Sequence, residues 1–325
     1  MENNVKDRYG RKIEYIRISL TDRCNLRCIY CMPYNGEYIL KMHDILTNDE
    51  LLRLTKIFSK LGIHKLKLTG GEPLIRRDFE TLTEKLSRIC EIDEITLTTN
   101  GTHFEKLQKT AHLFSSVNVS LDTLKPDKYR YITGNGDIEK VFETLDFLKK
   151  ENIVLKINTI PIKNFNDDEI IDFAEISKQN DISVKFIELM PIGLGKSIEG
   201  ISTDEVLNII KQTYGKPVKL SYKGNGPAHY FTFDGFKGKI GTISAMSHNF
   251  CNECNRLRLT ASGFLKTCLG FNRGVDLGMY LRSGVSDEKI SALIKKAVME
   301  KPLRNPFDNS SDKDMEKFNM NEIGG

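Results

Sequence analysis

The sequence predicts an α/β fold in which a run of strand–helix units is followed by a smaller α+β region. Over the first two-thirds of the chain, short apolar strands alternate with amphipathic helical stretches. The pattern changes after about residue 190, where a glycine-rich stretch leads into short, interrupted strands. Six successive strand–helix units imply a parallel sheet with helices outside, as an open sheet or as a full or partial barrel.

The first region contains six candidate strands, each a short apolar run rich in β-branched residues. They are Tyr15–Leu20, Lys65–Thr69, Glu94–Thr99, Ser116–Leu121, Val154–Ile160 and Ser183–Leu189. The helical patterns between them are Asn48–Leu61, Asp78–Ile89, Ile138–Lys150 and Asp167–Gln179. The first of these helices is preceded by Thr47 and carries Glu50 three residues later, which is the pattern of a capping box.

The second region reads as a small, mostly antiparallel unit with two helices. Its expected strands are Pro217–Tyr222, His229–Phe233, Lys239–Ser244 and Leu257–Thr260, and its helices lie near Thr203–Thr213 and Asp287–Glu300. The tail, residues 305–325, is polar, so we expect it to be flexible. We therefore divide the chain into residues 1–215 and residues 216–325.

Composition narrows the class of protein. Hydrophobic residues make up 39% and charged residues 28%, which is a globular balance. The net charge of +4 is too small to argue for a nucleic-acid partner. No apolar run approaches the roughly 20 residues needed to span a bilayer, and the first residues do not form a secretory signal. We expect a cytoplasmic protein with no membrane partner, in a compartment where disulfides are rare.

The seven cysteines therefore need another explanation, and six of them fall into two tight groups. Clustered cysteines in a reducing compartment usually bind metal. The seventh, Cys90, lies in an amphipathic helical pattern and is expected to be a buried small hydrophobic residue.

The first group, Cys24, Cys28 and Cys31, follows the first strand directly with Cys-x3-Cys-x2-Cys spacing. Three thiolates this close can hold three irons of a cubane [4Fe–4S] cluster, which usually takes four cysteines. One iron would then be open to an outside ligand, which is typical of a reactive cluster. The alternative is a zinc site, with His43 as a possible fourth ligand.

The second group has the spacing Cys251-x2-Cys254, with Cys268 following after thirteen intervening residues. It again provides three thiolates and no obvious fourth. Spacing alone is also compatible with a zinc knuckle.

Three basic residues lie inside expected strands, at Arg17, Lys67 and Lys156. Strand faces alternate with period two, so Arg17 and Lys156 each share a face with polar neighbours, opposite an apolar face. In a helix-covered sheet the apolar face points outward, which directs the polar face into the barrel. A buried charge needs an anion, and a triphosphate would serve. Internal ion pairing or exposure at frayed strand ends is the alternative.

The run Cys24-Asn25-Leu26-Arg27-Cys28-Ile29-Tyr30-Cys31 resembles the signature of the radical S-adenosylmethionine superfamily. The longer run from Ile18 to Pro33, and the run from Cys251 to Arg258, resemble one family within it, which begins molybdenum cofactor synthesis. The resemblance implies an incomplete (β/α)6 TIM-like barrel with a C-terminal α+β region that carries a second iron–sulfur cluster.

The resemblance also implies a reaction. The open iron of a first [4Fe–4S] cluster is chelated by the amino and carboxylate groups of S-adenosylmethionine. The cofactor is then cleaved to a 5′-deoxyadenosyl radical, which abstracts hydrogen from the ribose of GTP. The product is 3′,8-cyclo-7,8-dihydro-GTP, and a second [4Fe–4S] cluster touches the guanine.

The residues that the resemblance assigns fall into four sets. Cys24, Cys28, Cys31, Cys251, Cys254 and Cys268 bind iron. Tyr30, Gly71, Ser120 and Met190 line S-adenosylmethionine. Arg17, Lys67, Thr98, Lys156, Arg256, Leu257 and Arg258 contact GTP. Arg256 and Arg258 are candidates for stabilising the intermediate, and Gly324 and Gly325 reach into the active site. At Lys67 the family commonly has arginine, so lysine keeps the charge but loses the fork of donors.

By the same resemblance, the partners are an electron donor of the flavodoxin or ferredoxin type and cyclic pyranopterin monophosphate synthase, which receives the product. We expect a monomer or homodimer. Two other functions stay open: a radical enzyme that modifies a peptide with the help of an auxiliary cluster, and a non-catalytic metal-binding or electron-transfer protein.

Overall fold

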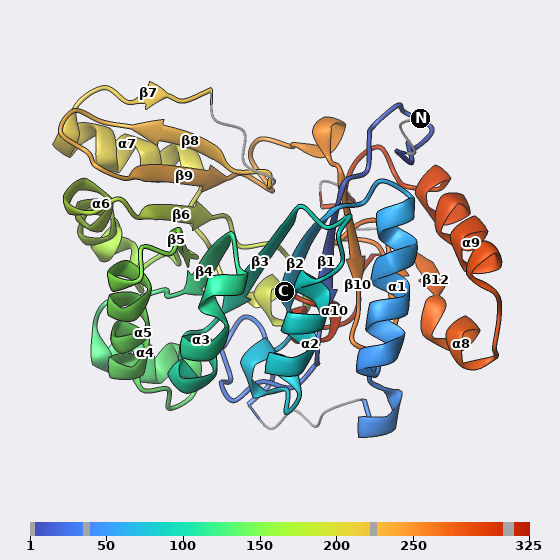
Figure 1. The fold of residues 1–325 in the computed structure, drawn as a ribbon. Coiled ribbons are helices and arrows are strands. Elements are labelled where there is room, and N and C mark those ends of the chain that lie inside the picture. The colour runs from blue at the N-terminus through green and yellow to red at the C-terminus, as the bar shows by residue number, and fades with distance from the viewer. Residues whose placement is uncertain (1–3, 35–39, 222–225, 308–314) are drawn as a thin grey trace.

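The computed structural model describes residues 4–34, 40–221, 226–307 and 315–325. The strands of these segments form one sheet of twelve, in the order β12-β11-β10-β1-β2-β3-β4-β5-β6-β9-β8-β7. The sheet curves, with the N-terminal helices on its outside and the C-terminus inside the curve (Figure 1).

The six expected strands of the first region are confirmed, and they pair in parallel in chain order. They are β1 (Tyr15–Ser19), β2 (Lys65–Thr69), β3 (Glu94–Thr99), β4 (Ser116–Ser120), β5 (Leu155–Thr159) and β6 (Ser183–Ile187). Each observed end lies within two residues of the expected one.

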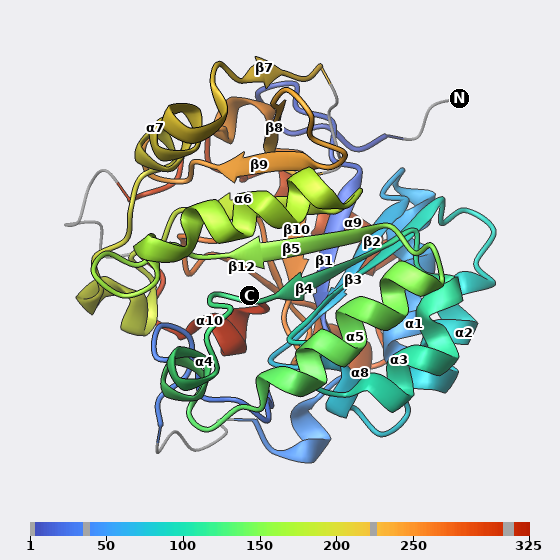
Figure 2. The same cartoon turned by 90° about the vertical axis from the view of Figure 1, so that its left-hand side faces the viewer.

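Helices follow these strands and cover the outer face of the sheet (Figure 2). They are α1 (Asn48–Lys60), α2 (Phe79–Ser87), α3 (Phe104–Thr110), α4 (Pro126–Thr133), α5 (Ile138–Lys150) and α6 (Ile170–Gln179). The predicted capping box of Thr47 and Glu50 at α1 is confirmed. The short helices α3 and α4 were not predicted, because seven and eight residues show too little of a helical period.

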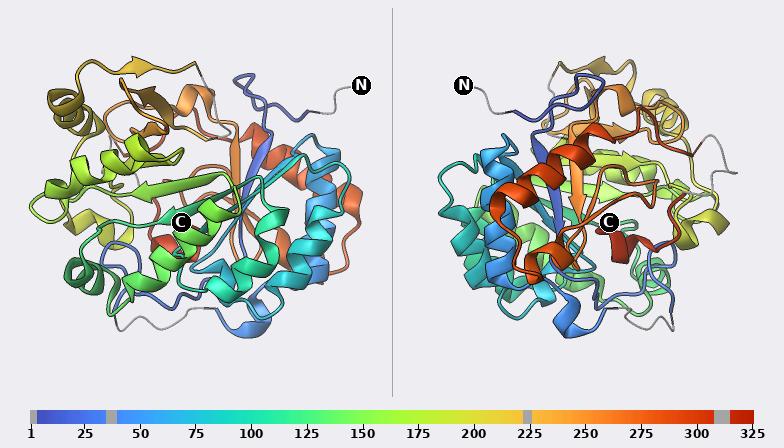
Figure 3. Two further views of the ribbon diagram at one scale, coloured as in Figure 1. Left: turned by 60° about the vertical axis from the view of Figure 1, so that its left-hand side comes forward. Right: turned by 90° about the vertical axis from the view of Figure 1, so that its right-hand side faces the viewer.

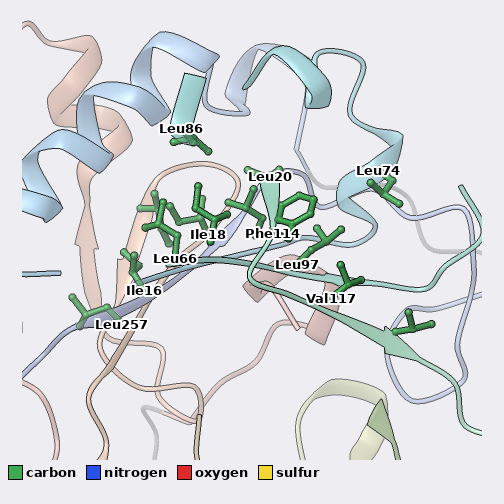
Figure 4. Packing of buried hydrophobic residues seen from close by; sticks show 14 of the residues in the cluster. Ile16, Ile18, Leu20, Leu66, Leu74, Leu86, Leu97, Phe114, Val117 and Leu257 are labelled. Carbon is green, nitrogen blue, oxygen red and sulfur yellow. The ribbon is translucent and has the colours of Figure 1, made fainter. Parts of the chain in front are cut away.

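The outward face of the central strands is the hydrophobic core. Ile16 and Ile18 of β1 and Leu66 of β2 are buried with Leu97 and Val117 of the next strands (Figure 4). The residues between them on β1 and β2, including Arg17, must point to the opposite, inner face. The period-two prediction for these strands is therefore confirmed.

The C-terminal strands do not form a separate sheet, which corrects the expectation of a small antiparallel unit. β10 (Arg256–Leu259) pairs in parallel with β1, and β9 (Lys239–Ile243) pairs in parallel with β6. The outer strands are antiparallel: β11 (Phe264–Lys266), β12 (Gly274–Asp276), β8 (His229–Thr232) and β7 (Val218–Lys219). A six-stranded open sheet leaves unpaired N–H and C=O groups on both edge strands, and β9 and β10 satisfy them. Tyr222 of the expected strand Pro217–Tyr222 lies outside the described residues.

The C-terminal helices are α7 (Thr203–Tyr214), α8 (Leu277–Arg282), α9 (Asp287–Met299) and α10 (Met320–Ile323). Single 3₁₀ turns lie at Met42–Asp44, Pro73–Ile75, Ala111–Leu113, Asp167–Glu169, Gly193–Ser197 and Cys251–Glu253. No helix of the described segments is long and apolar enough to cross a membrane.

The expectation of a flexible tail is wrong for residues 315–325. Glu316 forms a buried ion pair with Lys266 of β11, and α10 lies inside the curve of the sheet (Figure 3). The polar composition of the tail reflects the polar inner face on which it packs, so composition alone gave the wrong answer.

Candidate active site

The first cysteine trio lies on the loop that leaves the carboxyl end of β1, against the turn that follows β2. The amide of Gly71 donates to the carbonyl of Thr21 at 2.7 Å, and the amide of Glu72 donates to the carbonyl of Arg23 at 2.7 Å. A Cβ on Gly71 would lie 2.2 Å from the Arg23 carbonyl oxygen, so only glycine fits. The glycine pair thus lets the cysteine loop approach closely.

The sulfurs of this trio receive N–H donors. The amide of Leu26 lies 3.4 Å from Cys24 Sγ, the side-chain amide of Asn100 lies 3.8 Å from it, and the backbone of Asn321 donates to Cys31. Burial raises the pKa of Cys24 to about 11, with Glu72 adding to the effect, and burial raises the pKa of Cys31 to about 12.

These features fit an iron–sulfur cluster at the first trio. Cys28 is close enough to Cys31 and Cys24 for their charges to raise its pKa further. The iron of a cluster supplies the positive charge that three buried thiolates need, and N–H donors to sulfur are typical around such clusters. His43, the alternative zinc ligand, is exposed and lies 3.5 Å from Asp44.

Two buried carboxylates fix the loops around this trio, and sequence reasoning missed both. Glu72 accepts from the amides of Leu74 at 3.0 Å and Asn100 at 2.7 Å, and burial raises its pKa to about 7. Asp122 accepts from the Tyr30 hydroxyl at 2.5 Å, and burial raises its pKa to about 6. Both acids follow an expected strand within three residues, and this position is the sequence signal that could have identified them.

The four residues predicted for S-adenosylmethionine come to the same end of the sheet. Tyr30 is held by Asp122, and Ser120 is the last residue of β4. Met190 follows β6 in a turn near Tyr30: a Cβ on Gly195 would lie 2.7 Å from the carbonyl oxygen of Met190 and 3.8 Å from that of Tyr30. Together with Gly71, these residues surround the carboxyl ends of β1, β2, β4 and β6.

The predicted cations gather on the inner face of the sheet. Arg17 lies opposite Lys67 on one side and Arg258 on the other. Burial lowers the pKa of Lys67 well below its ordinary value, and the charges of Lys185, Arg17 and Lys156 lower it further. Side chains from β1, β2, β5 and β6 therefore form one positively charged lining, which favours an anion.

Lys185 belongs to this lining and was missed. Its ammonium donates to Asn118 Oδ1 of β4, and burial lowers its pKa well below the ordinary value. A lysine within an expected strand was the same signal that pointed to the other three cations. Thr98 of β3 lies opposite Asn118, next to the lining. Leu257, in contrast, packs in the hydrophobic core, so only its backbone is available to a substrate.

The second trio lies at the opposite end of the same strands. Cys254 precedes β10, whose Arg256 lies opposite Tyr15 at the start of β1. Cys268 follows β11, which runs antiparallel to β10 and so ends at the same edge. The first trio follows β1 and the second precedes β10, with the cationic lining between them. Five strand residues separate the two ends by about 13 Å.

The surroundings of the second trio also fit a cluster. Arg256 donates to Cys254 Sγ at 3.7 Å, and the backbone of Asn305 donates to Cys251. Burial raises the pKa of Cys254, but the charges of Arg256 and Lys301 outweigh it and hold that pKa at about 6. Cys251 and Cys268 are close enough for their charges to interact.

The C-terminal residues lie between the two trios. The Gly325 oxygen accepts from Arg17 and, at 2.8 Å, from the Thr69 hydroxyl, and the Gly324 carbonyl accepts from Arg258 at 2.7 Å. The remaining cysteine does not behave as expected: Cys90 lies beyond the end of α2 and is exposed. Helix α2 ends at Ser87, so the apolar face on which that expectation rested does not extend to Cys90.

Comparison with known proteins supplies the family. Residues 18–176 match the Radical SAM superfamily, and residues 182–307 match the family described as Molybdenum Cofactor Synthesis C. The chain is 45% identical to the GTP 3′,8-cyclase of Clostridium perfringens, with 99% of this chain and 100% of that protein covered. It is also 45% identical to the GTP 3′,8-cyclase of Syntrophomonas wolfei, with 98% and 99% covered.

The chain belongs to the GTP 3′,8-cyclase family. As a radical S-adenosylmethionine enzyme of this family, it uses S-adenosylmethionine together with an iron–sulfur cluster. Among solved structures, it resembles Streptococcus suis SuiB bound to S-adenosylmethionine, with a TM-score of 0.65 over 97% of this chain and 78% of that one. At 13% identity this likeness concerns the fold alone, and it agrees with the partial barrel expected for a GTP 3′,8-cyclase.

Proposed function

We propose that this chain converts GTP to 3′,8-cyclo-7,8-dihydro-GTP by radical chemistry, as the first step of molybdenum cofactor synthesis. The observation that carries the proposal is the cationic lining between two cysteine trios. A triphosphate matches four inward cations from four strands, and a substrate held between the trios is fixed at both ends.

The first trio, Cys24, Cys28 and Cys31, would hold a [4Fe–4S] cluster with an open iron for S-adenosylmethionine. When bound, the cluster and S-adenosylmethionine would supply the 5′-deoxyadenosyl radical chemistry that removes hydrogen from the ribose 3′ carbon. Tyr30, Gly71, Ser120 and Met190 line the cofactor. Asp122 fixes the Tyr30 ring, and Glu72 ties the turn after β2 to the one after β3.

The second trio, Cys251, Cys254 and Cys268, would hold a second [4Fe–4S] cluster that orients the guanine. The phosphates would be bound by Arg17, Lys67, Lys156 and Lys185, with Thr98 at the edge of the lining. Lys67 contributes charge but not the bidentate geometry of arginine. Arg256 and Arg258 stabilise the intermediate, the backbone of Leu257 contacts the substrate, and Gly324 and Gly325 order the site.

The division of labour follows the chain. Residues 1–215 provide the radical-generating barrel, and residues 216–325 provide the auxiliary cluster and part of the GTP site. A flavodoxin or ferredoxin supplies electrons, and cyclic pyranopterin monophosphate synthase takes the product. The reaction takes place in the cytoplasm, and the enzyme acts as a monomer or homodimer.

The test is an anaerobic assay of the reconstituted chain with reductant, S-adenosylmethionine and GTP. We expect 5′-deoxyadenosine and a cyclised nucleotide in equal amounts, and neither product from Cys28→Ala. The exposed Cys90→Ala variant is the matched control and should retain both. Deoxyadenosine formed without loss of GTP would indicate another substrate, such as a peptide. Zinc in place of iron in anaerobically purified protein would overturn the proposal.

A further inference from the structure

The segment that follows α9 wraps around the second cysteine trio. The ammonium of Lys301 donates to the carbonyl of Arg256 at 2.9 Å and to the carbonyl of Thr267. Arg256 lies two residues after Cys254, and Thr267 lies directly before Cys268. The backbone of Asn305 donates to Cys251. Lys301 is therefore tied to both strands that carry the trio.

Arg11 holds the same segment from the N-terminal side. Its guanidinium donates to the Pro302 carbonyl at 2.7 Å and to the Cys251 carbonyl at 2.6 Å. This bracing fixes the backbone on both sides of the trio, so the Lys301 side chain has a defined position next to it.

Lys301 differs in its partners from Arg11 and Lys266, two other buried cations near this trio. Arg11 is paired with Asp7 at 2.5 Å, and Lys266 is paired with Glu316. Lys301 is only 2% exposed, yet the partners that it has among the described residues are two neutral carbonyls. An ammonium has three N–H donors, so two carbonyls use two of them. A buried charge of this kind is costly unless an anion lies nearby.

We propose that Lys301 is the counter-ion of the second cluster and raises its reduction potential. A [4Fe–4S] cluster on cysteine thiolates is anionic and becomes more so on reduction, so a fixed positive charge beside it favours the reduced state. The inference deepens the proposed function, because it presumes a cluster on the second trio. It makes Lys301 a positioning and tuning residue rather than one that touches the substrate.

The test is a potentiometric titration of the holoenzyme followed by electron paramagnetic resonance, together with the iron content per chain. The first cluster is distinguished by the change in its spectrum when S-adenosylmethionine is added. We expect Lys301→Met to shift the midpoint potential of the second cluster to a more negative value. Lys301→Arg should stay near the wild type. The matched control, Lys295→Met, removes the same charge from an exposed position on α9 and should change nothing.

A Lys301→Met enzyme with a wild-type potential would overturn the inference, since Lys301 would then be only a brace for two carbonyls. If Lys301→Met loses the second cluster altogether, Lys301→Gln decides, because it keeps N–H donors without charge. A Gln variant with full iron and wild-type potential overturns the counter-ion role, and one with a lowered potential or half the iron supports it. A wild-type chain that binds only about four irons instead contradicts the proposed function itself.

Discussion

The two cysteine trios look alike in sequence but lie in opposite electrostatic surroundings. Around the first, the sulfurs receive neutral N–H donors. Burial raises the pKa of Cys24, and the charge of the buried acid Glu72 adds to this effect while that of Arg27 opposes it. The buried acid Asp122 acts in the same direction on the pKa of Cys28, which burial also raises. Around the second, the nearby groups are Arg256 and Lys301, and the pKa of Cys254 is lowered rather than raised.

The difference matches the ligands that we propose for the two ends of the site. S-adenosylmethionine carries a positively charged sulfonium, and neutral or acidic surroundings favour it over an anion. GTP is strongly anionic and requires cations along its length. In this proposal, the electrostatics of the first end favour S-adenosylmethionine and those of the second end favour GTP. The radical would then form at the first end, while GTP is bound from the second.

The largest expected effect is the loss of the second trio. Cys254→Ala should bind about four irons rather than about eight, cleave S-adenosylmethionine slowly and form no cyclised nucleotide, because only the first trio is intact. Iron analysis and product chromatography measure this, with Cys90→Ala as the control. Normal turnover on half the iron would show that the two trios are not both needed.

The next largest effect concerns the tail between the trios. Removing Gly324 and Gly325 deletes acceptors for Arg17, Thr69 and Arg258, so we expect the turnover rate to fall by about 100-fold, with iron content unchanged. Steady-state kinetics under anaerobic conditions measure it. Lys317→Ala, in an exposed part of the same tail, should retain wild-type rates. A truncated chain with full activity would remove the tail from the site.

A smaller effect is expected within the cationic lining. Lys156→Ala should weaken GTP binding by about 1.5–3 kcal/mol, the range for hydrogen bonds to charged groups, and leave S-adenosylmethionine binding unchanged. Calorimetric titration of the anaerobic enzyme with each ligand tests this. Lys150→Ala, which removes an exposed lysine at the end of α5, is the control. Equal weakening for guanosine, which has no phosphates, would contradict the role of Lys156 in phosphate binding.

What could be predicted from the sequence is what depends on local pattern. The six parallel strands could be predicted because five or six residues are enough to show a short apolar run with a period of two. The start of α1 could be predicted because Thr47 and Glu50 form its capping box. The cations Arg17, Lys67 and Lys156 follow from the same alternation, because a charge on the polar face of a covered sheet must point inward.

What could not be predicted depends on contacts between distant segments. The pairing of β10 with β1 and of β9 with β6 joins residues more than 50 positions apart, and no local pattern specifies it. The ordered tail rests on the ion pair of Glu316 with Lys266, which composition does not reveal. Lys185 is a different case: its signal was present in β6, but only the structure shows that the neighbouring strands bring it to Lys67.

The smallest expected effect concerns Glu72, the buried acid beside the first trio, and is measured as the pH dependence of the free energy of unfolding. Burial raises the pKa of Glu72 to about 7, against 4.5 for an ordinary glutamate. Between these values the folded chain keeps the proton and the unfolded chain does not, so the free energy of unfolding falls as pH rises from about 4.5 to about 7. Glu72→Gln also loses a hydrogen-bond acceptor, which lowers stability at every pH but does not add to the slope. Anaerobic urea unfolding at several pH values should therefore give a shallower slope for Glu72→Gln, and a wild-type slope for Glu84→Gln on the exposed face of α2. If Glu72→Gln keeps the wild-type slope, then the buried acid beside the first trio is not what makes that end of the site sensitive to pH.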